Sequence, residues 1–149
     1  MDMNIAAVIA SLSRKRKVFH SEADFQFALA WEIHELYPDC HIRLEYTPAV
    51  IDSTVRIDIC VLLKGELIPI ELKYLKKRLH YQDGDEIYKL RENGEQDLSR
   101  YDFLKDIQRI EYFKQNISNI SRGYAILLTN DPAYWKVGSK RVTIDVLAR

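Results

Sequence analysis

Residues 55–74 read VRIDICVLLKGELIPIELKY, a pattern typical of two strands joined by a tight turn. From Val55 to Leu63 the odd-numbered residues are all apolar, and from Leu67 to Tyr74 the apolar positions 68, 70 and 72 share one face. Alternation with a period of two indicates strands that bury one face. Lys64-Gly65 lies between them, where a two-residue hairpin turn belongs. The stretch therefore predicts a β-hairpin.

The length of the turn predicts which residues face one another across this hairpin. If the loop has two residues, Leu63 pairs with Glu66, and counting back places Asp58 directly opposite Glu71. A shift by two residues would place Asp58 opposite Lys73 instead. A shift by one is excluded, because it would send the two apolar faces to opposite sides of the sheet. In either allowed register Asp58, Glu71 and Lys73 share one face.

That shared face has the composition of a reactive site. Two carboxylates directly across a strand pair, with Cβ atoms ~5 Å apart, repel each other, so we expect a positive charge between them. Lys73 is one candidate and a divalent metal is the other. Oxygen ligands from two carboxylates, completed by water, suit Mg²⁺. Such a metal would bind a phosphate oxygen and activate a water, while Lys73 would orient that water or offset transition-state charge.

A helix is predicted upstream, in SEADFQFALAWEIHELYP (residues 21–38). Ser21 is a natural N-cap, and Pro38 ends the helical pattern. An apolar stripe runs along one face, formed by Phe25, Leu29, Ile33 and Leu36. Glu22 falls on this stripe. It either complements the helix dipole from the first turn or belongs to a site, and the helix alone leaves both explanations open.

The remaining segments predict one mixed α/β domain over residues 1–149, with its core at 21–131. Residues 1–20 are expected to form a short helix, Met3–Leu12, and a basic connector, Arg14–Lys17, which is solvated or touches phosphates. The other expected elements are a strand at His41–Tyr46, a long polar loop at 76–96, a helix at Asp97–Asn116 with Phe103, Ile107 and Ile110 on one face, a central strand at Gly123–Thr129 and a last strand at Arg141–Leu147. Pro69 has no backbone N–H to donate to a neighbouring strand. It must therefore lie in a part of its strand that is paired on one side only.

Composition excludes several classes of protein. The 22 basic and 22 acidic residues balance, which removes the simplest argument for a nucleic-acid binder. No GxGxxG, GxxxxGK[ST], HExxH or GxSxG motif is present, and the two cysteines are too few for a disulfide scaffold. No apolar run approaches the ~20 residues that span a bilayer. A cytoplasmic protein without a membrane partner is expected.

Asp58, followed thirteen residues later by Glu71-Leu72-Lys73, resembles the PD-(D/E)xK motif of restriction-endonuclease-like nucleases. The expected order of elements is similar to that superfamily's αβββαβ core, a mixed central sheet flanked by helices, over about residues 21–129. Ile57 stands where the motif's proline would be. The stretches 96–111 and 123–131 are similar to an unassigned bacterial group within the superfamily.

The resemblance implies a site and an activity. Asp58, Glu71, the Leu72 carbonyl and Glu22 would hold Mg²⁺ or Mn²⁺, with Lys73 as the catalytic lysine. The implied activity is metal-dependent cleavage of a nucleic acid, most simply DNA. A second copy of the chain, in a homodimer, is one source of a recognition surface.

Residues around the motif are candidates for binding nucleic acid. Lys76, Lys77 and Arg78 would meet the phosphate backbone, unless they only begin a solvated loop. Tyr81 and Tyr88 would stack on bases, close over the site or anchor the loop. Asp106 and Arg109, three residues apart on a predicted helix, would brace the site or contact a phosphate. We favour an exposed ion pair of little energetic consequence for these two.

Two other classes of protein stay open. One is a non-catalytic module that keeps the nuclease fold and binds nucleic acid or protein, which the zero net charge and the short chain favour. The other is an unrelated α/β domain, in which Asp58 and Glu71 would lie on opposite faces.

Overall fold

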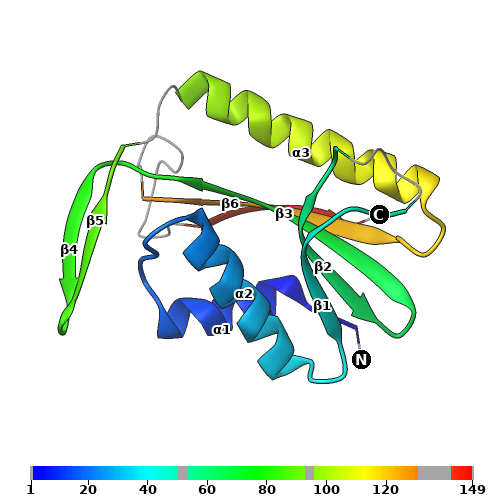
Figure 1. Ribbon diagram of the computed structural model, residues 1–149, viewed down its shortest axis with the longest axis horizontal. Coiled ribbons are helices and arrows are strands. Elements are labelled where there is room, and N and C mark those ends of the chain that lie inside the picture. Colours follow the sequence, from blue (N-terminus) through cyan, green and yellow to red (C-terminus); the bar gives the residue numbers. More distant parts are fainter. Residues whose placement is uncertain (1, 50–53, 93–95, 131–141, 149) are drawn as a thin grey trace.

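The computed structural model describes residues 2–49, 54–92, 96–130 and 142–148, and it describes side chains for all of these except 96–100 and 142–148. This part of the chain is mixed α/β, as predicted (Figure 1). Its elements, in chain order, are α1 (Ile5–Lys15), α2 (Glu22–Leu36), β1 (His41–Tyr46), β2 (Ile57–Leu63), β3 (Glu66–Leu75), β4 (Leu79–Asp83), β5 (Glu86–Leu90), α3 (Gln96–Asn116), β6 (Arg122–Thr129) and β7 (Val142–Ala148).

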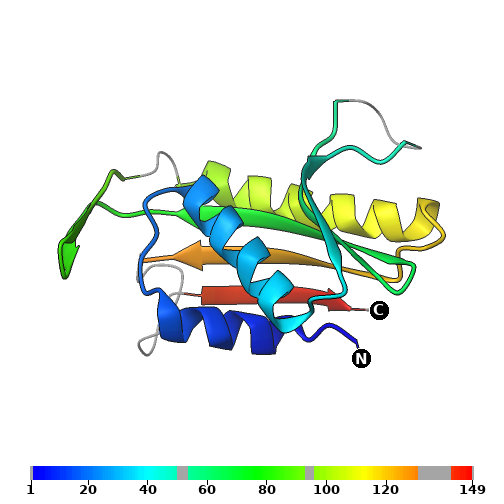
Figure 2. The same ribbon diagram turned by 60° about the horizontal axis from the view of Figure 1, so that its bottom comes forward.

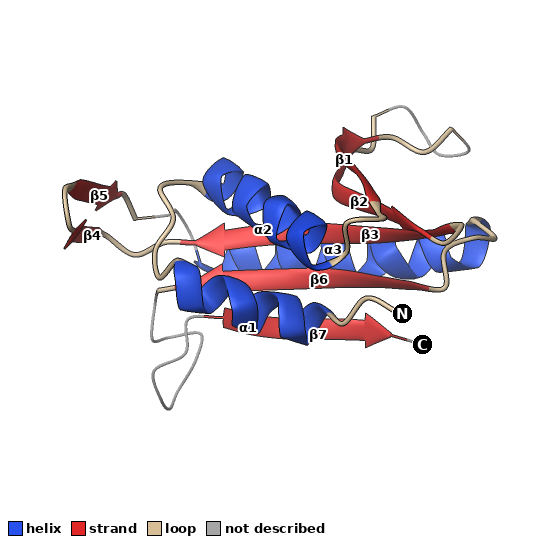
Figure 3. Cartoon of the chain, turned by 90° about the horizontal axis from the view of Figure 1, so that it is seen from below, coloured by secondary structure: helices blue, strands red, loops and turns tan. Residues whose placement is uncertain are grey.

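One mixed sheet forms the centre of the molecule. Its strand order is β1-β2-β3-β6-β7, and all neighbours are antiparallel except β3 and β6, which are parallel. Helix α3 covers one face of this sheet, and α1 and α2 cover the other (Figure 1). In the turned views α1 lies along β7 (Figure 2), and α2 lies beside it on the same face (Figure 3). None of the helices in the described residues is long and apolar enough to cross a membrane.

The hairpin of β2 and β3 has the first of the two predicted registers. Leu63 pairs with Glu66, and the ladder continues to Ile59 opposite Ile70. Lys64 (φ 53°) and Gly65 (φ 78°) both have positive φ, as a two-residue type I′ turn requires. Because this turn matches the twist of its strands, it sets the register locally.

Proline 69 occupies the position expected of it. The parallel ladder between β3 and β6 begins one residue later, at Ile70 opposite Tyr124. Pro69 therefore pairs only with Cys60 of β2, and its missing N–H costs no bond to β6. Gly123 lies against this proline: a Cβ there would come within 3.0 Å of Pro69 Cγ and 2.6 Å of Ile110 Cγ2.

Helix α2 begins and ends as predicted. The Ser21 side chain accepts a hydrogen bond from the Asp24 N–H at 3.1 Å, and the helix ends at Leu36. Phe25, Leu29 and Ile33 are buried in the core, but Leu36 is 44% exposed, so its predicted burial is wrong. The buried stripe ends at Ile33, one turn before the helix does.

Two predictions for polar segments need correction. Residues 76–96 are not an irregular loop, because β4 and β5 form an antiparallel hairpin within them. The basic run is not simply a solvated connector either. Helix α1 continues to Lys15, whose ammonium contacts buried Glu32 at 2.8 Å, and Arg16 contacts Asp24 at 2.7 Å. The predicted contact of this run with phosphates stays a prediction.

The helix and strands at the C-terminal side agree with their patterns. Phe103 and Ile110 of α3 are buried, and Ile107 packs against the same cluster. Every residue of β6 after Arg122 is buried, as expected of a central strand. Strand β7 pairs with β6 through Val142–Ala148, while residues 131–141 of the predicted core and last strand lie outside the described residues.

Candidate active site

Strands β2 and β3 separate at the position of the sequence motif. Their ladder extends to Ile59 opposite Ile70, whereas β3 continues to Leu75. Beyond that point the Leu72 N–H donates to Asp58 Oδ2 at 2.7 Å, and the Tyr74 N–H donates to Glu22 Oε2 at 3.2 Å. Two carboxylates thus replace the missing strand as acceptors.

The carbonyl of Leu72 faces the same opening. In an extended strand the N–H and C=O of one residue lie on the same side, and both would bond to a neighbouring strand. Since the Leu72 N–H is directed at Asp58, its carbonyl oxygen also points toward the space that β2 has left. The backbone therefore supplies a further oxygen beside the two carboxylates.

Glu71 is the most perturbed acid of the site. Its residue is only 3% exposed, and burial, with the nearby charges of Asp58 and Asp106, raises the pKa of its carboxyl to about 9. At neutral pH it carries a proton. Burial also raises the pKa of Asp58, and it outweighs the hydrogen bond from the Leu72 N–H, which lowers that pKa. Burial thus raises the pKa of both acids of the sequence motif.

Helix α3 contributes two more charged groups. Arg109 Nη1 lies 3.4 Å from Glu71 Oε1 and 3.7 Å from Asp106 Oδ1. Asp106 is 8% exposed, and burial raises its pKa while the charges of Lys73 and Arg109 lower it. Our preference for an exposed ion pair is therefore wrong, because Asp106 is buried and Arg109 also contacts Glu71, while its small energetic consequence stays a prediction. In the sequence Asp106 directly precedes Ile107, and helical periodicity alone does not predict which groups its side chain meets. Asp106 comes close to Glu71 only because α3 docks on the sheet as it does.

Glu22 reaches this cluster from the first turn of α2. Burial raises the pKa of its carboxyl, the bond from the Tyr74 N–H lowers it, and the charge of Asp58 raises it again. The charge of Lys73 lowers the pKa of both Glu22 and Asp106, so it acts on acids from two helices. The structure brings together all four side chains that the sequence proposed: Glu22, Asp58, Glu71 and Lys73.

Two neighbours of Asp58 were not anticipated. Gln26, one turn after Glu22, donates to the Asp58 carbonyl at 2.7 Å and to Glu45 Oε1 at 3.4 Å. The charge of Glu45 contributes to the raised pKa of Asp58. Glu45 has φ 53°, a left-handed conformation that is uncommon outside glycine. The signal in the sequence that could have identified Gln26 is its spacing of four residues from Glu22, which places both side chains on one face of the helix.

The donor set of the cluster suits a hard cation. Its four acids offer oxygen ligands, which Mg²⁺ and Mn²⁺ prefer. As the described side chains stand, no three His, Cys, Asp or Glu residues are grouped to hold a metal ion. Glu71 Oε1 faces Arg109 and Asp58 Oδ2 accepts from Leu72. The residue types therefore suit a metal ion, but in their present rotamers the carboxylate oxygens are not directed at one common point.

The segment after the motif has mixed roles. The Lys77 backbone exchanges hydrogen bonds with the Asn130 side chain at 2.6 and 3.0 Å, and the Lys76 ammonium lies 5.0 Å above the Tyr74 ring. Arg78 is exposed. Tyr88 is only 3% exposed, which agrees with an anchor and not with a platform for bases.

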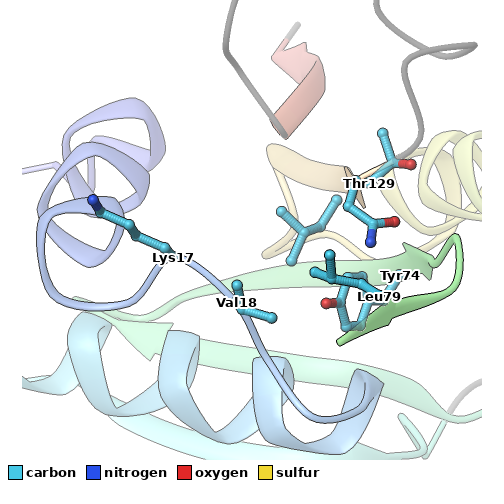
Figure 4. A pocket seen from close by; sticks show the side chains of 7 residues that line it. Lys17, Val18, Tyr74, Leu79 and Thr129 are labelled. Atoms are coloured by element: carbon cyan, nitrogen blue, oxygen red, sulfur yellow. The ribbon is translucent and has the colours of Figure 1, made fainter. Parts of the chain in front are cut away.

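A small pocket lies beside this segment, where the connector between α1 and α2 approaches the ends of β3 and β6 (Figure 4). Val18, Tyr74 and Leu79 contribute much of its lining. It contains none of the four carboxyl groups, so we assign the chemistry to the carboxylate cluster and not to this pocket.

No protein-family model, curated protein or solved structure matches this chain. The function must therefore be argued from the cluster itself, because an α/β sheet alone is compatible with many activities.

Proposed function

We propose that this protein is a divalent-metal-dependent phosphodiester hydrolase that cleaves DNA, a nuclease of the PD-(D/E)xK type. One observation carries the proposal: Asp58 and Glu71 lie near each other just beyond the end of the β2–β3 ladder, with Lys73 two residues beyond Glu71 and close enough to act on two more acids. The order of elements from α2 to β6, with a parallel β3–β6 pair, is compatible with the αβββαβ core of that superfamily.

The charge balance of the cluster supports a divalent ion. Glu22, Asp58, Glu71 and Asp106 carry four negative charges when ionised, and Lys73 and Arg109 carry two positive charges. The sum is −2, which one divalent cation neutralises. The raised pKa of each of the four acids has burial as its largest cause, and a bound cation would offset that cost.

Asp58, Glu71, the Leu72 carbonyl and Glu22 would hold Mg²⁺ or Mn²⁺. When bound, the ion supplies Lewis acidity toward a phosphate oxygen and a water of lowered pKa. Because Glu71 faces Arg109 in the structure, we infer that this carboxylate loosens its contact with Arg109 when it becomes a ligand. Arg109 would then be the group that holds Glu71 in place while no metal is present.

The chain's own residues have separate roles in the hydrolysis. The Leu72 N–H orients Asp58, and the Tyr74 N–H orients Glu22. The Lys73 ammonium, placed among the acids, positions the attacking water and balances the extra negative charge that the phosphate gains in the transition state. The oxygen of water forms a bond to phosphorus and a bridging P–O bond breaks, and the proton that the water gives up to solvent balances the proton that the leaving oxygen takes up.

Cleavage assays test the proposal directly. Wild-type protein should cut DNA in Mg²⁺ or Mn²⁺ and not in chelator, and Lys73→Ala should lose the activity. Lys64→Ala is the matched control, because Lys64 is an exposed lysine in the turn at the far end of the same hairpin. Absence of cleavage of duplex, single-stranded and branched DNA and of RNA with both ions would contradict the proposal.

A non-catalytic nucleic-acid-binding module that retains this fold is the second candidate. The ion contact between Arg109 and Glu71 favours it, since it occupies an oxygen that a metal would need. This candidate predicts nucleic-acid affinity that is unchanged by Asp58→Ala and by chelator, without cleavage. The third candidate, an unrelated domain with Asp58 and Glu71 on opposite faces, is less well supported, because the charge of Asp58 contributes to the raised pKa of Glu71 and the two acids therefore lie near each other.

A further inference from the structure

The hairpin of β4 and β5 extends away from the rest of the molecule. It projects beyond the ends of the sheet strands, on the side where α2 begins (Figures 1 and 3). Its first strand starts at Leu79, four residues after β3 ends at Leu75. The hairpin is thus joined almost directly to the strand that carries Glu71 and Lys73.

One face of this hairpin is tied to the body. Tyr88 and Leu90 are each 3% exposed, within the main hydrophobic core. The His20 ring stacks on Tyr88 with centroids 4.1 Å apart, and His20 Nε2 lies 2.7 Å from Glu86 Oε2. Leu79 also packs against the core. These contacts settle which face of the hairpin is turned inward.

The opposite face is exposed and basic. Because the register pairs His80 with Lys89 and Gln82 with Ile87, and side chains alternate along each strand, Arg78 and Arg91 continue the same face just outside the strands. All six residues of this outer face are exposed: Arg78, His80, Gln82, Ile87, Lys89 and Arg91. None of them is acidic. The hairpin's acids lie at its tip, at Asp83, Asp85 and Glu86.

This arrangement is unfavourable for an isolated hairpin. Like charges that gather on one face of a strand pair repel each other, and the outer face holds the cations Arg78, Lys89 and Arg91 with no acid among its six residues. An anion that is not part of this chain would relieve the repulsion. Five residues of strand span about 16 Å, the length of about five base pairs of duplex.

We propose that this outer face binds the phosphate backbone of duplex DNA beside the cleavage site, an inference that rests on the proposed nuclease function. Duplex is favoured over single-stranded DNA because binders of single strands combine positive charge with exposed aromatic rings. The outer face has no aromatic ring except the imidazole of His80, since Tyr81 and Tyr88 are on the inner face. Arg78, Lys89 and Arg91 carry the phosphate contacts.

The test measures binding without cleavage. Fluorescence anisotropy of a short labelled duplex, in chelator, is recorded between about 50 and 200 mM salt. The variant Arg78→Gln/Lys89→Gln/Arg91→Gln is compared with Arg43→Gln/Lys64→Gln/Lys105→Gln, which removes three exposed cations elsewhere and changes the net charge equally. Circular dichroism and urea midpoints verify that both variants fold.

The proposal predicts at least about a 10-fold weaker affinity for the hairpin variant, with a salt slope shallower by about 2 to 3, because each duplex phosphate contact contributes about 0.9. The control variant should stay close to wild type. Equal losses in both variants, no binding by wild type at the lowest salt, or tighter binding of the single strand would overturn it. Cleavage without hairpin dependence refutes only this inference, and hairpin-dependent binding without cleavage refutes only the nuclease.

Discussion

The Glu71→Gln substitution should make the protein more stable at alkaline pH. The Glu71 carboxyl has an ordinary pKa of 4.5, which the folded protein raises to about 9. Between these two values the unfolded chain has released the proton and the folded chain keeps it. Stability therefore falls as pH rises through this window, and it is greatest below the unfolded pKa. Glutamine resembles the protonated acid in shape and does not titrate.

The magnitude follows from the width of the window. One pH unit corresponds to about 1.4 kcal/mol, so Glu71 alone removes about 4 kcal/mol of stability between about pH 5 and pH 8. This figure is large because the carboxyl is almost fully buried, with 3% of the residue exposed. Asp58 and Asp106 also have raised pKa values, and they add to the same trend.

Urea unfolding in chelator at these two pH values measures the effect. The loss of unfolding free energy from about pH 5 to pH 8 should be smaller in Glu71→Gln than in wild type, by about 4 kcal/mol. Glu35→Gln is the matched control, an exposed glutamate on α2 that should behave as wild type. If the Glu71→Gln curve runs parallel to wild type within about 1 kcal/mol, Glu71 does not hold a proton in the folded state, and the reasoning is refuted.

Three further predictions concern the same region. Lys73→Ala should lower the cleavage rate at least about 100-fold with unchanged metal affinity in calorimetry, and an equal loss of metal affinity would contradict a role in the chemical step. Affinity for Mg²⁺ should rise with pH up to about 9, because the proton on Glu71 must leave first; affinity that is constant with pH would argue against Glu71 as a ligand. Gly123→Ala should cost about 1–3 kcal/mol in urea unfolding, because its Cβ would lie 2.6 Å from Ile110 Cγ2 and 3.0 Å from Pro69 Cγ; a neutral effect would mean that the strand and helix yield freely.

The hairpin of the motif was predictable because its determinants are local. Two-fold alternation and the Lys64-Gly65 turn together left two registers, and the turn length favoured the one observed. The cap at Ser21 and the end of α2 likewise depend on neighbouring residues only. These features place Asp58, Glu71 and Glu22, so most of the carboxylate cluster follows from sequence.

The contributions of α3 were not predictable in the same way. Spacing places Asp106 and Arg109 on one helix face, but whether that face meets solvent or Glu71 depends on how α3 docks on the sheet. Because α3 docks with Asp106 buried and with Arg109 beside Glu71, the pair adds its charges to the carboxylate cluster. Leu36 shows the converse, since a perfect stripe does not reveal where the core beneath it ends.

The hairpin of β4 and β5 was missed for a chemical reason. Its inner face consists of Leu79, Tyr81, Tyr88 and Leu90, and most of the residues that alternate with them are polar, so the segment is polar on average. The two-residue turn at Gly84 (φ 61°) was the available signal. A Gly-Asp pair flanked by two short alternating stretches predicts a hairpin, even where overall polarity is typical of a loop.

Calorimetric titration with Mg²⁺ or Mn²⁺, comparing wild type with Asp58→Ala, tests the central claim most directly because it needs no substrate. Asp58 lies near Glu71 and accepts a hydrogen bond from the Leu72 N–H, so its loss should abolish a metal site at this position. We predict saturable binding in wild type, with release of protons, and none in Asp58→Ala. Binding of equal strength in both proteins, or none in wild type even with duplex DNA present, would contradict a metal-dependent nuclease at this cluster.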